Sequence, residues 1–213
     1  LHRNKPGSKI IVLDANPGIV AEKHTFENAF NVTYADVLTY QPNTTILSVD
    51  SNQRSVNTNL GAYDADVLNV IPTHRAGSII RQTGLANSTD GRWANVNPLS
   101  YESTNTPYIH IIGDSQGTGQ PKAGHIANAE AKVCADAVIR LIAGQQPYQA
   151  PMTNSACFSP ISSNTASWLT AVFSYDAATG SMKVVPASSG EALAPSKENY
   201  SDMFDWAHSL FGD

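Results

Sequence analysis

The feature that most constrains the fold is a short apolar run, followed by a glycine-rich loop and then by a helical pattern. The run 108–112 ends at Gly113 and Asp114, as a buried strand does at the edge of a sheet. Pro121 opens an alanine-rich segment and Gly144 closes it, so both the start and the stop signal of a helix are present. This order predicts an α/β fold in which Asp114 and the start of the helix face one crevice.

The chemistry of such a crevice suits a cofactor. The free N–H groups and the dipole at a helix start favour an anion or an electron-rich ring. A carboxylate such as that of Asp114 accepts hydrogen bonds from the hydroxyls of a sugar or a ribityl chain. A Gly-Asp pair after a strand is nevertheless common in α/β proteins, so this motif needs support from the surrounding sequence.

Three segments resemble the flavoprotein subunit of flavocytochrome c sulfide dehydrogenase, and they occur in that family's order. The first covers ADVLNVIPTHRAGSIIRQTGL (65–85) and GRWANVNPLSYEST (91–104). The second joins Gly113 and Asp114 to PKAGHIANAEAKV (121–133), and the third is TNSACFSPIS (153–162). Both chain ends, LHRNKPGSKIIVLDANP and YSDMFDWAHSLFGD, are also similar to the family, so the resemblance spans essentially the whole chain.

The resemblance implies an α/β fold, a partial two-dinucleotide-binding-domain flavoprotein of the glutathione-reductase-like kind. Residues 1–72 would be the back half of the second, NAD-like domain, and residues 73–144 the C-terminal part of the FAD-binding domain. Residues 145–213 would form a C-terminal α+β flavin-binding domain of the sulfide dehydrogenase. No GxGxxG occurs, so we expect this chain to be the C-terminal portion of a longer flavoprotein. Asp14 reads as the acid ending a second strand or, equally, as a turn residue.

The resemblance also implies which residues hold the cofactor. FAD in the complete protein would be bound by Gly113 and Asp114 and by the turn of Pro121, Lys122 and Ala123 at the helix start. Roles beside the ring for Thr73 and His74 are a further possibility, with an exposed loop position as the alternative.

The two cysteines receive different predictions. Cys157, in a Ser/Asn/Pro-rich segment expected to be a loop, matches a redox cysteine that forms a disulfide above the flavin. Its partner in the family lies upstream, so Cys157 is expected to be a free thiol here. Cys134 lies within the helix, off the charged face of Lys132, Asp136 and Arg140, and is expected to pack inside.

The function implied is oxidation of sulfide by the flavin-adjacent disulfide, with electrons passed to a cytochrome c subunit in the periplasm. The fragment alone is expected to have no turnover. Alternatives are a sulfide:quinone or an NAD(P)H-linked flavoprotein oxidoreductase, or a non-catalytic fragment that self-associates, for example as a homodimer.

Composition narrows the classes of partner. The 213 residues are 41% hydrophobic with a net charge of −5, which supports a folded core and gives no electrostatic reason to bind nucleic acid. No apolar run is long enough to cross a membrane, and no metal site is predicted. The apolar face of 200–211 is expected to dock on its own protein. Strands are expected over 9–13, 32–38, 45–50, 55–59, 67–71 and 168–175, the last with a hairpin partner at 184–185.

Overall fold

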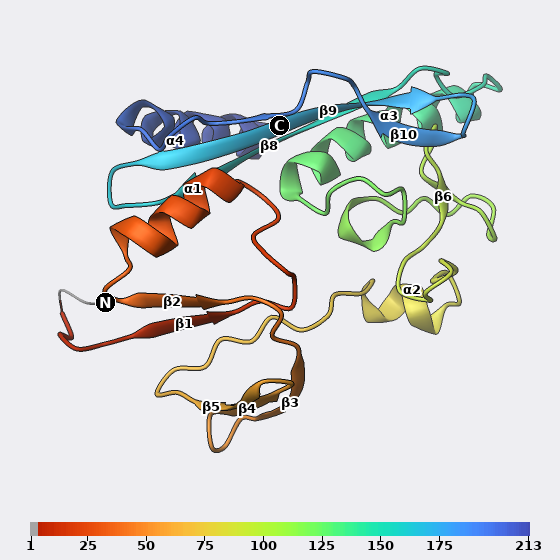
Figure 1. Ribbon diagram of the computed structural model, residues 1–213. Coiled ribbons are helices and arrows are strands. Elements are labelled where there is room, and N and C mark those ends of the chain that lie inside the picture. Colours follow the sequence, from red (N-terminus) through yellow and green to blue (C-terminus); the bar gives the residue numbers. More distant parts are fainter. Residues whose placement is uncertain (1–3) are drawn as a thin grey trace.

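The computed structural model describes residues 4–213; the first three residues of the family-like amino-terminal segment lie outside this range. The larger part of the fold is a four-stranded antiparallel sheet with helices on both faces. In Figure 1, α4 (Lys197–Gly212) lies on one face of this sheet, whereas α1 (Lys23–Asn28) and α3 (Gly124–Ile142) lie on the other. In the same view the smaller strands and the loops lie below these two helices.

The sheet is built around one long strand, β9 (Ala166–Asp176). β8 (Met152–Pro160) pairs with it over its whole length, and β10 (Ser181–Val184) and β11 (Gly190–Glu191) pair along its other edge. The predicted strand and hairpin are therefore confirmed. The loop expected around Cys157 is wrong, because that segment is β8 and its backbone is fixed by the antiparallel ladder to β9.

The two long helices follow their sequence signals. α3 begins three residues after Pro121, and the chain turns away at Gly144, whose φ of +71° suits a residue without a side chain. α4 begins after Ser196, whose hydroxyl oxygen accepts a hydrogen bond from the Asn199 amide at 3.0 Å. The Trp206 ring of α4 packs against Phe158 of β8 at 5.6 Å, which confirms that this helix docks on its own protein.

The amino-terminal part contains two small sheets. β1 (Ile10–Leu13) pairs in parallel with β2 (Leu38–Gln41), and β3 (Ile46–Asp50), β4 (Ser55–Thr58) and β5 (Gly61–Asp64) form an antiparallel meander. The strands predicted over 9–13, 45–50 and 55–59 are confirmed. The strand predicted over 32–38 is wrong in most of its length, because α1 continues into the π-helix η1 (Ala29–Thr33) and β2 begins only at Leu38.

Asp14 closes the turn that follows β1. Its carboxylate accepts hydrogen bonds from the Asn16 backbone at 2.9 Å and from the Tyr40 hydroxyl of β2 at 2.7 Å. Burial opposes ionisation, but these hydrogen bonds outweigh it and hold the pKa of Asp14 below its ordinary value. Asp14 thus ends a strand and caps a turn at once.

Two predicted strands are absent from the part of the chain that the structure describes. Residues 67–71 form no strand, and Val67 and Ile71 are 85% and 73% exposed. Residues 108–112 are also irregular; they make one bridge, from His110 to Glu102, and Tyr108 is 91% exposed. The neighbouring strands β6 (Val96–Asn97) and β7 (Glu102–Ser103) are too short to continue the pairing.

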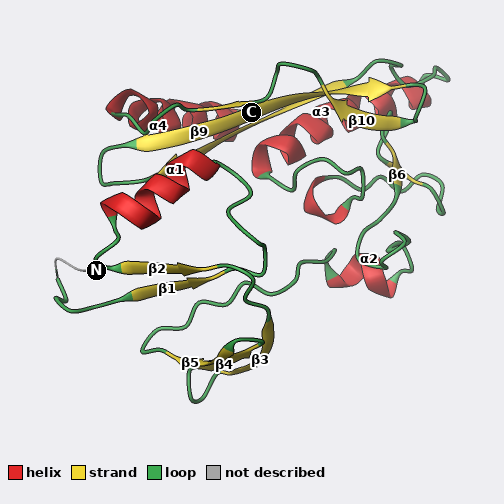
Figure 2. Ribbon diagram, viewed as in Figure 1, coloured by secondary structure: helices red, strands yellow, loops and turns green. Residues whose placement is uncertain are grey.

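The buried core is divided between two clusters. One joins Leu85, Ala94, Val96, Tyr101 and Ile111, with Cys134 of α3 packed against it, as predicted for that thiol. The other joins Ile126 of α3 to the sheet residues Phe173 and Met182. In Figure 2, α3 passes between the sheet and the irregular segments that contain α2 (Ser78–Gln82) and the 3₁₀ turn η2 (Gly113–Ser115). α3 therefore carries the loop 113–123 against the sheet.

Within residues 4–213, no helix is long and apolar enough to cross a membrane.

Candidate functional site

One buried carboxylate of α3, that of Glu130, holds the loop 113–123 by hydrogen bonds. Glu130 is completely buried; its Oε2 accepts a hydrogen bond from the Gly113 amide and its Oε1 accepts one from the Gln116 side chain, both at 2.6 Å. Gln116 in turn accepts from the Thr118 amide, and the Gly117 amide donates to the Ala94 carbonyl at 2.8 Å. The loop is thus held by side chains as well as by its own backbone.

Burial dominates the protonation of Glu130. Desolvation raises the pKa of its carboxyl to about 7, although the hydrogen bonds from Gly113 and Gln116 and the charge of Lys122 act in the opposite direction. Glu130 therefore titrates near neutral pH. Sequence reasoning missed it, because one glutamate in an alanine-rich helix looks like a solvent-facing residue.

Lys122 is turned back onto the loop. Its Nζ donates to the Gln116 carbonyl at 2.5 Å and lies 4.0 Å from the centre of the Trp93 ring, a cation–π contact. Burial lowers the pKa of Lys122, while the carboxylates of Asp114 and Glu130 act to raise it. The predicted cofactor residue is thus a half-buried cation that is bound to the loop and feels the charges of two acids.

The other predicted loop residues lie around this cation. Gly113 has φ of +67°, which a glycine adopts without strain, and Asp114 follows it as an exposed residue of η2. Pro121 is exposed, and Ala123 is the extended residue that precedes α3. The loop therefore begins against the first turn of α3, since a Cβ on Gly113 would meet Ala127 Cβ at 3.5 Å. The binding roles of these residues stay a prediction.

A second buried contact joins the loop to the sheet. The Gln120 side-chain amide donates to the Thr153 hydroxyl of β8, and Gln120 Oε1 accepts from the Tyr101 hydroxyl at 3.2 Å. All three residues are buried. The Gln120 contact brings the loop to the same face of β8 on which Cys157 lies, because residues 153 and 157 are an even number of positions apart.

Cys157 is a half-buried free thiol in β8. Its Sγ lies 3.8 Å from the Ser155 hydroxyl, and it lies directly opposite Leu169 of β9. Within residues 4–213 both cysteines are free, so Cys157 forms no disulfide with Cys134. Burial raises the pKa of the Cys134 thiol, which suits a packing role. From strand geometry Cys157 lies about 13 Å along β8 from Thr153, the end that Gln120 holds.

Thr73 and His74 lie in the irregular segment before α2, and both are exposed. The His74 carbonyl accepts from the Arg92 guanidinium at 3.5 Å. His74 therefore occupies an exposed loop position, which the sequence analysis gave as the alternative to a role beside the flavin ring.

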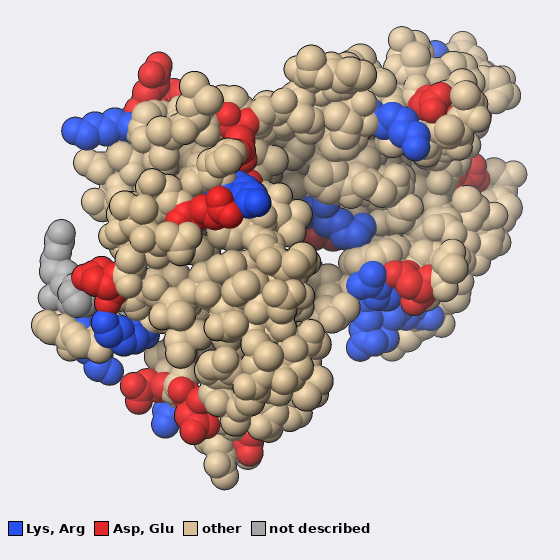
Figure 3. Space-filling view, in the orientation of Figure 1, with Lys and Arg blue, Asp and Glu red and all other residues tan. Residues whose placement is uncertain are grey.

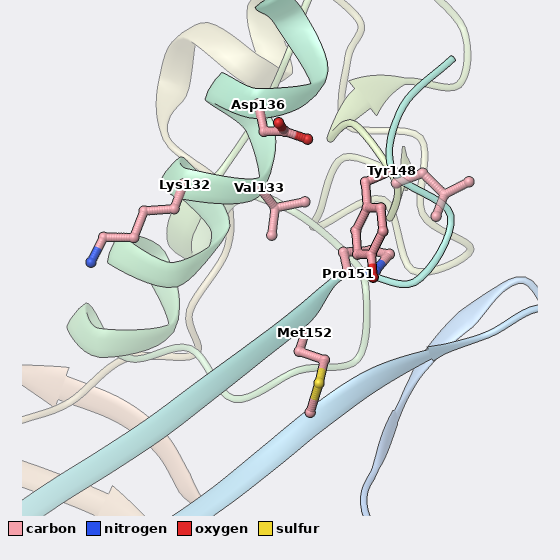
Figure 4. Close-up of a pocket in the computed structure, with 7 residues that line it drawn as sticks. Lys132, Val133, Asp136, Tyr148, Pro151 and Met152 are labelled. Carbon is pink, nitrogen blue, oxygen red and sulfur yellow. The ribbon is translucent and has the colours of Figure 1, made fainter. Parts of the chain in front are cut away.

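Two pockets of about 270 Å³ each lie away from the loop. Figure 4 shows the first, where Lys132, Val133 and Asp136 of α3 face Tyr148, Pro151 and Met152. The second is apolar and lies between Phe26 and Phe30 on one side and Pro160 and Ile161 on the other. Figure 3 shows a further cleft beside the part of the molecule that carries α2, with charged side chains at its edge. Within the described residues no group of His, Cys, Asp and Glu is arranged to hold a metal ion.

Comparison with known proteins gives a family for the first third of the chain. Residues 1–72 match the model of the central region of the sulfide dehydrogenase (flavocytochrome c) flavoprotein chain. This part of the chain matches a flavoprotein family. The resemblance drawn from the sequence is confirmed there, and the structure mixes helices and sheets, as the predicted fold class does.

Solved structures show more distant similarity. A chain of the mitochondrial ATP synthase of Tetrahymena thermophila is similar with a TM-score of 0.58 at 16% identity, over 77% of this chain and 40% of that chain. At this identity the similarity concerns the fold alone. Reduced CoADR-RHD of Bacillus anthracis has a TM-score of 0.48 at 13% identity, over 96% of this chain and 42% of that chain, which is too low to support an argument. The chain thus spans 40% and 42% of the length of these two chains.

Proposed function

We propose that this chain is part of an FAD-dependent sulfide dehydrogenase that passes electrons to a cytochrome c subunit. The observation that carries the proposal is the placement of Cys157 and the loop 113–123 on the same face of β8, joined by the contact of Gln120 with Thr153. The match of residues 1–72 to a flavoprotein chain of that enzyme supports the same assignment. The two-dinucleotide-domain architecture and the periplasmic location belong to this proposal.

The residues of the loop fit a flavin in their chemistry. Asp114 is an exposed carboxylate that can accept hydrogen bonds from ribityl or ribose hydroxyls. The turn of Pro121, Lys122 and Ala123 places the start of the 19-residue helix α3 beside it, and a helix start favours the electron-rich edge of a ring. Gly113 follows the irregular segment 108–112 and adds no side chain to the loop.

Cys157 supplies the sulfur chemistry in this proposal. A sulfide anion attacks a disulfide sulfur and releases a thiolate, and Cys157 would be one half of that disulfide when its partner cysteine is present. A bound flavin would accept the electron pair and release electrons singly to a haem. The chain's own task is to hold the thiol on the stiff strand β8 while Glu130 and Gln116 fix the loop.

Self-association is a second candidate, and one observation favours it. Large apolar side chains are exposed on irregular segments at Val67, Ile71 and Tyr108 and on α2 at Ile79. A second copy of the chain could cover them. Acceptance of electrons by a quinone at the C-terminal helix is less supported, because α4 uses Trp206 to pack against its own sheet.

The test joins this chain to the remaining part of a flavocytochrome c flavoprotein and measures sulfide-dependent reduction of cytochrome c. We expect bound FAD and activity that Cys157→Ser abolishes and Cys134→Ser leaves intact. Full activity of Cys157→Ser would refute the role of that thiol. Reduction of a quinone but not of the cytochrome would refute the acceptor. Sedimentation of the chain alone, with Val67→Asp as the variant, tests self-association.

A further inference from the structure

A chain of hydrogen bonds runs through the loop 113–123 from α3 to the Thr118 amide. Glu130 Oε2 accepts from the Gly113 amide and Glu130 Oε1 accepts from the Gln116 side-chain amide, both at 2.6 Å. The side-chain oxygen of Gln116 accepts in turn from the Thr118 amide. Gln116 is therefore the link between the carboxylate and the far half of the loop, which lies beside the first turns of α3 in Figure 1.

The bonding partners fix the orientation of the Gln116 side chain. A backbone amide only donates, so the Gln116 oxygen faces the Thr118 N–H and Gln116 Nε2 faces Glu130. Gln116 is 1% exposed and Glu130 is fully buried. Because solvent does not reach either side chain, a change of charge at Glu130 has to be met by Gln116.

The backbone around Gln116 is held independently of these side chains. The Gly117 amide donates to the Ala94 carbonyl at 2.8 Å, and the Ala94 amide donates to the Ser115 carbonyl at 3.0 Å. Lys122 Nζ donates to the Gln116 carbonyl at 2.5 Å. The side chain is thus the part of Gln116 that is free to rotate.

Protonation of Glu130 places a donor where an acceptor was. At Oε2 the new O–H would meet the Gly113 N–H, which cannot become an acceptor. At Oε1 it meets the side-chain amide of Gln116, which can turn over and offer its oxygen instead. The turned amide then directs Nε2 toward the Thr118 N–H, so that two donors face each other. The Thr118 amide loses its acceptor as a result.

We propose that Glu130 and Gln116 form a proton-operated switch that controls the Thr118 amide. While Glu130 is ionised, Gln116 holds this amide within the loop. When one proton from the solvent binds Glu130 Oε1, Gln116 turns over and the Thr118 amide is released. Thr118 is half-buried, so its released N–H becomes a donor for water or for an anionic group of a ligand. The inference rests on the proposed function only for the cofactor that the loop would hold.

The groups that surround Glu130 set the pH range of the switch. Burial raises the pKa of its carboxyl to about 7; the charge of Lys122 favours the ionised form and that of Asp114 opposes it. Tyr101 also faces Glu130, and burial, followed by the charge of Glu130, raises the pKa of its hydroxyl. Cys134 lies one turn further along α3, and burial raises the pKa of its thiol. Tyr101 and Cys134 therefore stay neutral where Glu130 titrates.

The test is an NMR titration of the 213-residue chain from about pH 5.5 to about pH 8.5. The carboxyl carbon of Glu130, the side-chain amide of Gln116 and the Thr118 amide should share one midpoint near pH 7. Hydrogen exchange of the Thr118 amide, corrected for its intrinsic pH dependence, should be roughly tenfold faster at the acidic end, because its hydrogen bond is lost. The Gly117 amide, whose acceptor is the Ala94 carbonyl, is the internal control and should not follow this midpoint.

Two variants separate the switch from a general loosening of the loop. Glu130→Gln is neutral at every pH, so the Thr118 signals should stop titrating and remain near their low-pH position. Gln116→Met removes the link, so Glu130 should still titrate while Thr118 no longer follows it. Glu198→Gln, at an exposed position of α4, should match the wild type.

A Thr118 amide that does not follow the titration of Glu130 in the wild type would overturn the proposal. So would a Thr118 amide that still titrates with the midpoint of Glu130 in Gln116→Met. If Glu130→Gln does not fold, these two measurements are sufficient. None of them requires bound FAD, so a reassembled protein that binds no flavin would defeat the proposed function and leave the switch unaffected.

Discussion

Replacing Glu130 by glutamine should change how the stability of the protein depends on pH. The pKa of Glu130 is about 7 in the folded chain against 4.5 for an ordinary glutamate, because its carboxyl is buried. A raised carboxyl pKa means that the folded state binds the proton more tightly. The folded state is therefore favoured by low pH, and this advantage is lost as the pH rises from 4.5 to 7. At about 1.4 kcal/mol per unit, the loss is about 3 kcal/mol above pH 7.

The assay is urea denaturation of the wild type and of Glu130→Gln at pH values from 4.5 to 8.5. The glutamine cannot accept the bonds from both Gly113 and Gln116, so its absolute stability is expected to be lower at low pH. The decisive quantity is the difference between the two unfolding free energies, in which the other titrating groups cancel. It should fall by about 3 kcal/mol from pH 4.5 to 8.5. The matched control Glu198→Gln, at an exposed site, should change by less than about 0.5 kcal/mol. A flat difference for Glu130→Gln would refute the reasoning.

Three further variants, with His125→Phe as a comparison for the last, probe the contacts around the site. Gly113→Ala should destabilise the chain by about 1 kcal/mol, since a φ of +67° disfavours a side chain, and thermal unfolding would measure the loss; an unchanged midpoint would contradict the assigned backbone. Tyr101→Phe should cost about 1 kcal/mol in urea unfolding, because the hydroxyl that donates to Gln120 is lost in a buried place, and a neutral outcome would mean that this bond is not formed. Trp206→Ala should loosen α4, so that limited proteolysis cleaves within the last helix, whereas His125→Phe, which removes the acceptor of the indole and Ala156 N–H groups but keeps the Trp206 ring, should have a smaller effect. Equal cleavage of Trp206→Ala and wild type would show that the indole does not hold the helix.

The elements predicted correctly are those whose sequence carries a start signal and a stop signal. The segment from Pro121 to Gly144 is rich in good helix formers and closed by a residue that tolerates a left-handed conformation, so local signals and tertiary structure agree. The hairpin between β9 and β10 turns through Thr179 and Gly180, where the Asp176 carboxylate binds the turn. Such signals act over a few residues and can be read from sequence.

The elements predicted wrongly depend on partners that are distant in sequence. Residues 108–112 have the composition of a strand, but the neighbouring strands are only two residues long. In addition, the Tyr108 amide donates its hydrogen bond to the Glu102 side chain instead of to a strand. Val32 and Thr33 favour strands, yet they end the π-helix η1, whose Phe30 ring packs against the Phe26 ring of α1. The polar residues around Cys157 suggested a loop, whereas pairing with β9 makes a strand of them. In each case tertiary context overrides local propensity.

The candidate site shows the same division. Sequence could nominate Asp114, Lys122 and Cys157, because each falls within a motif. It could not find Glu130, since its significance lies in a buried environment and in a contact 17 residues away in the chain. Whether the nominated residues hold FAD stays a prediction.

The hydrogen bond between Gln120 and Thr153 ties the loop 113–123 to β8, the strand that also carries Cys157. Linkage then requires reciprocity: if occupation of the loop alters the reactivity of the sulfur, oxidation of the sulfur alters occupation of the loop by the same factor. A chain built in this way would let the redox state of one atom set the affinity for whatever the loop holds.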